Sequence, residues 1–181
     1  MTTAGLVLAA GEGKRFGGPK APYVHDGIRL VDRAVQVLTE AGCDQVFVVL
    51  GAWVGEVPNA TVLENPSWPT GMGSSLQVGL QYLNGQPEIE DVVITLVDLP
   101  GLTSEAVARV IESPGEIVVA CYEAKRGHPV KFARANWPEL SRSSSGDQGA
   151  RAFISEHDEE IVLVEVGDVA SGEDMDERPI T

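Results

Sequence analysis

The sequence predicts an α/β fold built on a mostly parallel sheet. Residues 6–10 form a continuous apolar run that ends in a glycine-rich loop, residues 28–41 repeat apolar side chains at helical spacing, and residues 45–50 form a second apolar run. A strand, a loop, a helix and a strand within about fifty residues make a βαβ unit. Such units place their strands in parallel and gather the loops that follow them at one edge.

The length and composition predict one globular domain over residues 1–181. The chain has 43% hydrophobic and 22% charged residues, enough for a sizeable core. No apolar run approaches the roughly 18 residues that span a bilayer, and the start at Met1 lacks the basic residues of a secretory signal. We therefore expect a cytoplasmic protein without a membrane partner. Cys43 and Cys121 lack ligand-like spacing, which favours reduced structural thiols.

Charge is unevenly distributed along the chain. The formal net charge of −14 disfavours binding to nucleic acid and to anionic membranes. Lys14, Arg15 and Lys20 nevertheless lie within a short stretch, whereas the last part of the chain is mostly acidic. A local positive pocket in an acidic protein predicts a small polyanionic substrate with a divalent metal.

The loop after the first predicted strand has the composition of a phosphate cradle. Gly11, Gly13, Gly17 and Gly18 allow positive φ and close approach of the backbone to a ligand. The three cations of the same stretch supply full charge. The alternative is a tight turn with solvated cations.

Two well-known glycine motifs do not fit this loop. A Walker loop needs Lys followed by Ser or Thr, but Ala21 follows Lys20 here. The dinucleotide-binding pattern needs a third glycine where Phe16 stands, and the second predicted strand ends at Leu50-Gly51 without an acidic residue for a ribose. A third kind of phosphate site is therefore required.

The next elements continue the α/β alternation. Residues 60–63 predict a short strand, and the helix after it has the apolar face Leu76, Leu80 and Leu83. Ser74 or Ser75 can cap this helix, or the helix start can direct N–H donors at a ligand. Both interpretations remain open from spacing alone.

Residues 91–97 form the most apolar predicted strand, and Asp98 follows it directly. A carboxylate at the end of a buried strand is well placed to hold Mg²⁺ together with substrate phosphates. The alternative is a turn carboxylate, because Asp-x-Pro is common turn chemistry.

The second half predicts a helix over 103–111 and strands over 116–122 and 161–166. His128 lies between them, where it is either an acid–base group or a turn histidine beside Pro129. Residues 141–149 are polar and lack a hydrophobic period, which predicts a mobile loop and a candidate lid.

Several motifs, in order, resemble the molybdenum-cofactor nucleotidyltransferase family, in particular its molybdopterin cytidylyltransferase-like, MobA-like NTP transferase members. Residues 8–20 (LAAGEGKRFGGPK) resemble the signature loop, and residues 65–76 (NPSWPTGMGSSL) resemble the second motif. Asp98-Leu-Pro, Gly127-His-Pro-Val-Lys-Phe and Gly146-Asp-Gln-Gly-Ala-Arg resemble three further motifs. The C-terminal Asp-x-Asp-Thr-Pro motif is less well matched, because Glu177-Arg178 stands where one Thr is usual.

The resemblance implies a single-domain, three-layer αβα, Rossmann-like nucleotidyltransferase fold. It implies transfer of a nucleoside monophosphate, with CTP as donor and molybdopterin as the phosphorylated acceptor, with release of pyrophosphate. The Ala-Ala-Gly start is more similar to the cytidylyl than to the guanylyl branch. A molybdenum enzyme is a further candidate partner.

The resemblance also assigns residues. Arg15, Lys20 and Asp98 are the catalytic candidates, and Mg²⁺ is expected on Asp98 with Asp174 or Asp176. The nucleotide-binding candidates are Leu8, Ala9, Ala10, Gly11, Gly13, Lys14, Arg15, Lys20, Gly51, Ala52, Ser74 and Ser75. The acceptor-binding candidates are Asn65, Gly127, His128 and Pro129.

Two other functions remain open. One is transfer to another phosphorylated acceptor, such as a sugar phosphate. The other is a non-catalytic nucleotide-binding accessory protein for molybdoenzyme maturation, which the altered C-terminal motif favours.

Overall fold

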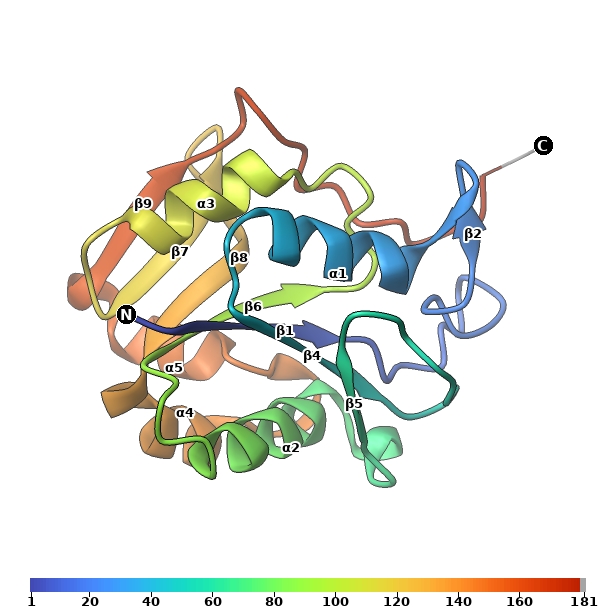
Figure 1. The fold of residues 1–181 in the computed structure, drawn as a ribbon, viewed down its shortest axis with the longest axis horizontal. Coiled ribbons are helices and arrows are strands. Elements are labelled where there is room, and N and C mark those ends of the chain that lie inside the picture. The colour runs from blue at the N-terminus through green and yellow to red at the C-terminus, as the bar shows by residue number, and fades with distance from the viewer. Residues whose placement is uncertain (180–181) are drawn as a thin grey trace.

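A computed structural model describes residues 1–179, and these residues form a seven-stranded sheet with helices on both faces (Figure 1). The strand order is β5-β4-β1-β6-β8-β7-β9. The sheet strands are β1 (Thr3–Leu8), β4 (Gln45–Leu50), β5 (Thr61–Glu64), β6 (Asp91–Leu96), β7 (Ile117–Tyr122), β8 (Lys125–Ala133) and β9 (Ile161–Glu165). A separate small hairpin joins β2 (Val24–His25) to β3 (Ile28–Arg29).

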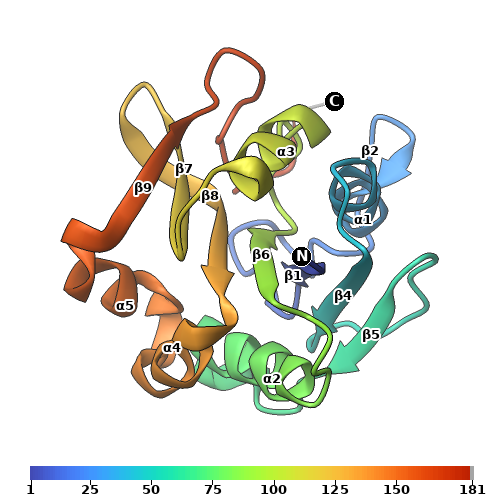
Figure 2. The same cartoon turned by 60° about the vertical axis from the view of Figure 1, so that its left-hand side comes forward.

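The helices divide between the two faces, as Figure 2 shows from the side. One face carries α1 (Leu30–Glu40) and α3 (Ser104–Glu112), and the other carries α2 (Met72–Asn84), α4 (Trp137–Ser143) and α5 (Arg151–Glu156). The short 3-10 turns are η1 (Trp68–Thr70), η2 (Arg134–Asn136), η3 (Gly146–Gln148) and η4 (Asp158–Glu160). The predicted three-layer fold is confirmed. Within residues 1–179, no helix is long and apolar enough to cross a bilayer.

The hydrophobic core lies on both sides of the sheet. Leu38 of α1 and Val107 of α3 belong to the cluster on one face, and both are fully buried. Leu80 of α2 and Trp137 of α4 belong to the cluster on the other face. Strands buried on both faces read as continuous apolar runs, which is why β1, β4 and β6 were predictable from sequence.

Strand β8 was not predicted. It runs antiparallel to both β6 and β7, and the tight turn before it places Glu123 and Ala124 at φ 50° and 66°. Pro129 inside the segment argues against a central strand. Buried Lys131 also breaks the apolar pattern, but its ammonium donates to the carbonyls of Ile111 and Ser113 at 3.1 and 2.6 Å.

Of the two interpretations of Ser74 and Ser75, helix capping is wrong. Helix α2 begins at Met72 after Gly71, which has φ 114°, so both serines lie inside the first turn. The Ser74 hydroxyl donates to the carbonyl of Gly71 at 2.8 Å. Glycine provides the backbone geometry that a serine cap was expected to provide.

The predicted loop over residues 141–149 is partly helical. Helix α4 extends through Ser143, and η3 covers residues 146–148. The remainder packs closely on α2, because a Cβ added to Gly73 would lie 2.8 Å from the backbone nitrogen of Ser145. The side chain of Gln77 also donates to the Ser144 carbonyl at 2.8 Å. Gly73 and Gln77 therefore hold the loop against the helix.

Candidate active site

The glycine-rich loop leaves β1 at the carboxyl edge of the parallel strands. Its fold depends on Gly13, which has φ +62° and whose carbonyl accepts bonds from the Gly17 and Gly18 amides at 2.8 and 3.1 Å. A Cβ on Gly13 would lie 2.0 Å from the Gly18 carbonyl oxygen. A side chain therefore cannot be accommodated at this position without rebuilding the loop.

A cluster of opposite charges joins this loop to two distant segments. The Lys20 ammonium lies 2.7 Å from Asp98 Oδ2 and 3.5 Å from Asp176 Oδ1. Arg15 Nη1 lies 3.6 Å from Asp176 Oδ2. Lys20 and Asp98 are largely withdrawn from solvent, with side chains 15% and 17% exposed. The structure thus brings together three of the predicted catalytic groups and one predicted metal ligand, which we call the charged cluster (Arg15, Lys20, Asp98 and Asp176).

Asp174 lies close to this cluster. Burial, followed by the negative charges of Asp98 and Asp176, raises the pKa of the Asp174 carboxyl. Asp98 Oδ1 is buried and has no hydrogen-bond partner among the described residues. Partial desolvation of neighbouring carboxylates disfavours their charges and is relieved by a cation.

Residues 1–179 contain no group of three metal-ligating side chains close enough to hold an ion by themselves. The Lys20 ammonium instead lies between Asp98 and Asp176. The unpartnered oxygen of Asp98 and the neighbouring Asp174 fit a hard cation that takes its remaining ligands from substrate phosphates. When bound, such an ion neutralises phosphate charge.

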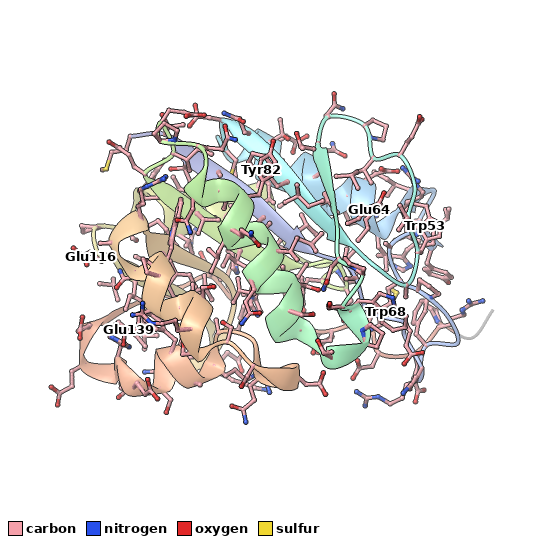
Figure 3. The ribbon with its side chains drawn as sticks, turned by 90° about the horizontal axis from the view of Figure 1, so that it is seen from below. Trp53, Glu64, Trp68, Tyr82, Glu116 and Glu139 are labelled. Atoms are coloured by element: carbon pink, nitrogen blue, oxygen red, sulfur yellow. The ribbon has the colours of Figure 1, made fainter. Side chains whose placement is uncertain are left out.

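A cavity of about 390 Å³ opens beside the glycine-rich loop. It is lined by Leu8, Ala10, Gly11, Glu12, Lys14, Trp68, Pro69, Gly71, Met72, Ser75 and Asp147. Five of the predicted nucleotide-binding residues are therefore among its walls. Figure 3 shows Trp68 near the first turn of α2, far along the helix from Tyr82. We call this cavity the loop cavity.

Three serines beside the loop cavity are hydrogen-bonded to Asn65. The Asn65 amide donates to the hydroxyls of Ser74 and Ser75 at 2.8 and 2.9 Å, and its oxygen accepts from the Ser67 amide at 2.9 Å. Asn65 is 1% exposed. The structure therefore gives Asn65 an internal contact that fixes η1 against α2, while Ser75 reaches the cavity wall.

The predicted pair Gly51 and Ala52 lies behind the loop cavity. The Ala52 amide donates to the Ala10 carbonyl at 3.0 Å. A Cβ on Gly51 would lie 2.6 Å from Cβ of Trp68. This close packing places the two residues as a support for Ala10 and Trp68, and neither of the pair lines the loop cavity.

A second cavity of about 290 Å³ lies between β6, β8 and α5, and we call it the apolar groove. Its walls are Leu8, Met72, Leu76, Ile94, Leu96, Val119, Arg126, Gly127, His128, Val130, Asp147, Gln148, Ala150, Arg151, Ile154 and Ser155. Gly127 and His128, two of the predicted acceptor-binding residues, are among these walls, and Pro129 is buried in β8 next to them. Leu8, Met72 and Asp147 line both cavities, which therefore adjoin.

The surroundings of His128 favour its neutral form. Burial lowers the pKa of its imidazole, against the raising effects of the Ile94 carbonyl and the Asp98 charge. Its Nδ1 is buried without a hydrogen-bond partner among the described residues. A neutral ring with an unused nitrogen is suited to hydrogen bonding a ligand in the groove.

Sequence reasoning did not assign Trp68, Asp147, Gln148 or Arg151 to the site. All four lie inside the motifs over residues 65–76 and 146–151. The motifs were recognised from the sequence, but no role was assigned to these four residues. Residues 5–161 match the model of the MobA-like NTP transferase domain. The chain belongs to this family.

The nicotine blue oxidoreductase of Paenarthrobacter nicotinovorans, a curated relative, is 36% identical over 95% of this chain and 91% of its own length. The probable molybdenum cofactor guanylyltransferase of Bacillus cytotoxicus is 27% identical over 69% of this chain and 65% of its own length. The crystal structure of Rv0371c from Mycobacterium tuberculosis H37Rv superposes with a TM-score of 0.80 at 26% identity, covering 96% of this chain and 93% of that one.

A manganese complex of Rv0371c is also similar, with a TM-score of 0.72, 26% identity and coverage of 92% of this chain and 89% of that one. A divalent metal is therefore plausible for this MobA-like chain. Family membership supports a nucleotidyltransferase enzyme that uses a nucleoside triphosphate.

Proposed function

We propose that this MobA-like enzyme transfers CMP from CTP to the phosphate of molybdopterin, with Mg²⁺ and release of pyrophosphate. The observation that carries the proposal is the meeting of the loop cavity and the apolar groove at Leu8, Met72 and Asp147. The Val97 amide donates to the carbonyl of Leu8 at 3.2 Å, so Asp98, the next residue along the chain, lies close to this junction. A donor and an acceptor can meet there beside the charges.

The triphosphate is assigned to the glycine-rich loop. The backbone of Gly11 and Gly13, with Lys14 and Arg15, holds the β- and γ-phosphates in this proposal. Lys14 and Arg15 have side chains 82% and 78% exposed, so both can reorient towards a ligand. Trp68 and Ser75 on the opposite wall of the loop cavity contact the base and ribose.

Lys20 stabilises the charge that develops at the α-phosphate. The acceptor phosphate attacks the α-phosphorus, the bond from this phosphorus to the bridging oxygen breaks, and pyrophosphate leaves. A phosphate monoester has its second pKa near 6 and is a dianion at neutral pH, so no general base is needed. The histidine beside the proposed site, His128, lies in the apolar groove, and burial lowers the pKa of its imidazole, which makes it a weaker base.

The metal is assigned to Asp98 with Asp174 or Asp176. The unpartnered Asp98 oxygen and the raised pKa of Asp174 support this assignment. Lys20 must exchange its contact with Asp98 for one with phosphate when the metal and nucleotide bind. Positioning and charge neutralisation then account for catalysis.

The acceptor is assigned to the apolar groove. Its aliphatic walls can enclose a flat ring system, while Arg151 and the free nitrogen of His128 offer polar contacts. Molybdopterin is supported by the name of the Bacillus cytotoxicus relative and by the motifs of the chain.

The test is to incubate the protein with each of the four triphosphates, Mg²⁺ and molybdopterin, and to measure pyrophosphate. The proposal expects release with CTP that requires molybdopterin and stops in excess chelator. Release with GTP instead would reassign the base, and release with a sugar phosphate in place of molybdopterin would reassign the acceptor. Nucleotide binding without pyrophosphate from any combination would favour the accessory role.

A second candidate is an oxidoreductase acting on a conjugated ring compound. The 36% identity to nicotine blue oxidoreductase over nearly the whole chain favours it, and the apolar groove is compatible with a flat substrate. Such a reaction requires a redox cofactor but not Lys20 or Asp98. Colour change of nicotine blue with reduced nicotinamide and flavin cofactors, retained in Asp98→Asn, would support this candidate over the transferase.

A further inference from the structure

We propose that Arg178 is a positioning residue that fastens the C-terminal segment to the glycine-rich loop and thereby holds Asp176 in the charged cluster. The proposal rests on the proposed function, because it assigns Arg178 a part in binding the metal that accompanies the triphosphate. Arg178 stands where the resemblance led us to expect a threonine. The substitution therefore does not weaken the C-terminal motif but gives it a different anchor.

The contacts of Arg178 are all with the loop region. Its guanidinium lies 5.4 Å from the ring centre of Phe16 and 5.5 Å from that of Tyr23. The two rings meet edge to face at 4.8 Å. Arg178 Nη2 also donates to the Gly17 carbonyl at 3.4 Å. The guanidinium is thus held by two aromatic rings and one backbone acceptor.

Phe16 couples this contact to the charged cluster. It is 2% exposed, so its ring position is fixed by packing. The Lys20 ammonium lies 5.9 Å from the same ring centre. Arg178 and Lys20 therefore both contact the ring that the glycine-rich loop presents, and Asp176 bonds to Lys20 at 3.5 Å.

The chain after β9 is held at points on both sides of Asp176. Figure 1 shows it crossing from β9 towards the β2 hairpin. The Ser171 amide donates to the Gly101 carbonyl at 3.0 Å, and the Met175 amide donates to the Asp98 carbonyl at 2.8 Å. Arg178 supplies the anchor on the far side. Without it, Asp176 would be held from one side only.

The consequence is specific to the second carboxylate. Loss of Arg178 frees the segment from residue 176 onward but leaves the loop and Asp98 intact. We expect weaker metal binding in the presence of nucleotide, with little change in the rate at saturating metal. Two exposed cation–π contacts together correspond to about a fivefold to thirtyfold change.

The experiment compares Arg178→Ala, Arg178→Lys and the control Arg142→Ala, which removes an exposed arginine from α4. Hydrogen exchange of residues 171–179 is measured without ligands. The KM for Mn²⁺ and the KM for CTP are measured separately by pyrophosphate release. In parallel, Mn²⁺ binding is measured on the complex of the protein with a non-hydrolysable CTP analogue.

The proposal expects faster exchange of residues 171–179 and an Mn²⁺ KM raised about fivefold to thirtyfold in Arg178→Ala. It also expects an unchanged CTP KM, an unchanged unfolding temperature and partial recovery in Arg178→Lys. Exchange equal to that of the wild type and of Arg142→Ala would overturn it. If the wild type itself binds no Mn²⁺ with nucleotide, the assigned function fails, whereas the exchange result still decides whether Arg178 anchors the segment.

Discussion

The charged cluster and the apolar groove lie at the same edge of the sheet but are built in opposite ways. The cluster is assembled from side chains far apart in sequence, as in the contacts of Lys20 with Asp98 and Asp176. The groove is walled largely by aliphatic side chains of strands and helices, among them Ile94, Val130 and Ile154. The cluster offers charged groups to a ligand, whereas the groove limits the shape of the ligand that fits.

In the proposed function, this difference assigns the transfer step to the charged cluster and the choice of acceptor to the apolar groove. Charges placed next to a triphosphate serve the transfer step for any acceptor, whereas an apolar groove selects the acceptor by its shape and by a few polar contacts. A relative named for a blue compound and one named for a molybdenum cofactor can therefore share this fold. Substitutions in the two regions should affect different kinetic constants.

The largest effect is expected in the charged cluster. Lys20→Met removes the ammonium but keeps the chain length, and Asp98→Asn keeps the shape but removes the carboxylate charge. Each should lower the kcat of pyrophosphate release by about 10²–10³, because one preorganised electrostatic partner is lost. Steady-state kinetics at saturating CTP measure this effect.

The matched control is Arg142→Met, since Arg142 is an exposed cation on α4 outside both cavities. It should keep the wild-type rate. Near-normal kcat in both Lys20→Met and Asp98→Asn would remove the cluster from the transfer step.

The next effect concerns the loop that lies between the two regions. Gly73→Ala forces a Cβ to within 2.8 Å of the Ser145 backbone and displaces the segment that carries Asp147. Overpacking of this kind costs about 1–3 kcal/mol, and thermal unfolding should report it as a lower midpoint.

Gly85→Ala is the control, because its Cβ would meet Tyr82 at 3.3 Å at the free end of α2. It should shift the unfolding midpoint less than Gly73→Ala does. Equal midpoints for the two variants would show that the loop is not held closely against α2.

A smaller effect is expected in the apolar groove. Arg151→Gln removes a charge that faces the proposed acceptor. The KM for the acceptor should rise about tenfold with kcat unchanged, as for a contact made equally in the ground and transition states. The KM for CTP should remain constant, and a rise in the CTP constant alone would place Arg151 with the nucleotide.

The smallest effect is a dependence of stability on pH. The pKa of His128 is lowered in the folded protein, so below about pH 6.5 the unfolded chain binds more protons than the folded one. Stability should therefore fall as the pH is lowered through this region. Denaturant unfolding from pH 7 to pH 5 should show a shallower fall in His128→Asn, and an identical fall would remove His128 as the cause.

Much of the fold could be predicted from sequence because buried parallel strands carry continuous apolar runs. β1, β4 and β6 are such runs, and the residues that follow them reach the site. β8 could not be predicted, because Pro129 and Lys131 interrupt the apolar pattern of a central strand. Only tertiary contacts provide hydrogen-bond acceptors for the Lys131 ammonium. The helix start at Gly71 was missed because glycine at a positive φ takes the place of a side-chain cap.

The candidate site shows the same division. Lys20 lies in the glycine-rich loop after one apolar strand and Asp98 directly follows another, and the family resemblance marked both as catalytic candidates. The structure places them 2.7 Å apart. The aliphatic walls of the groove could not be predicted, since they read as ordinary core residues until the sheet and helices are assembled. The anchoring contact of Arg178 with Phe16 also depends on a separation that no local pattern reveals.

The most direct test of the central claim is the binding of Mn²⁺, titrated with and without a non-hydrolysable CTP analogue. If the charged cluster is a metal and triphosphate site, the ion should bind weakly to the free protein and much more tightly with the analogue. Asp98→Asn should abolish this gain. Equal Mn²⁺ binding with and without the analogue, or an undiminished gain in Asp98→Asn, would contradict the account.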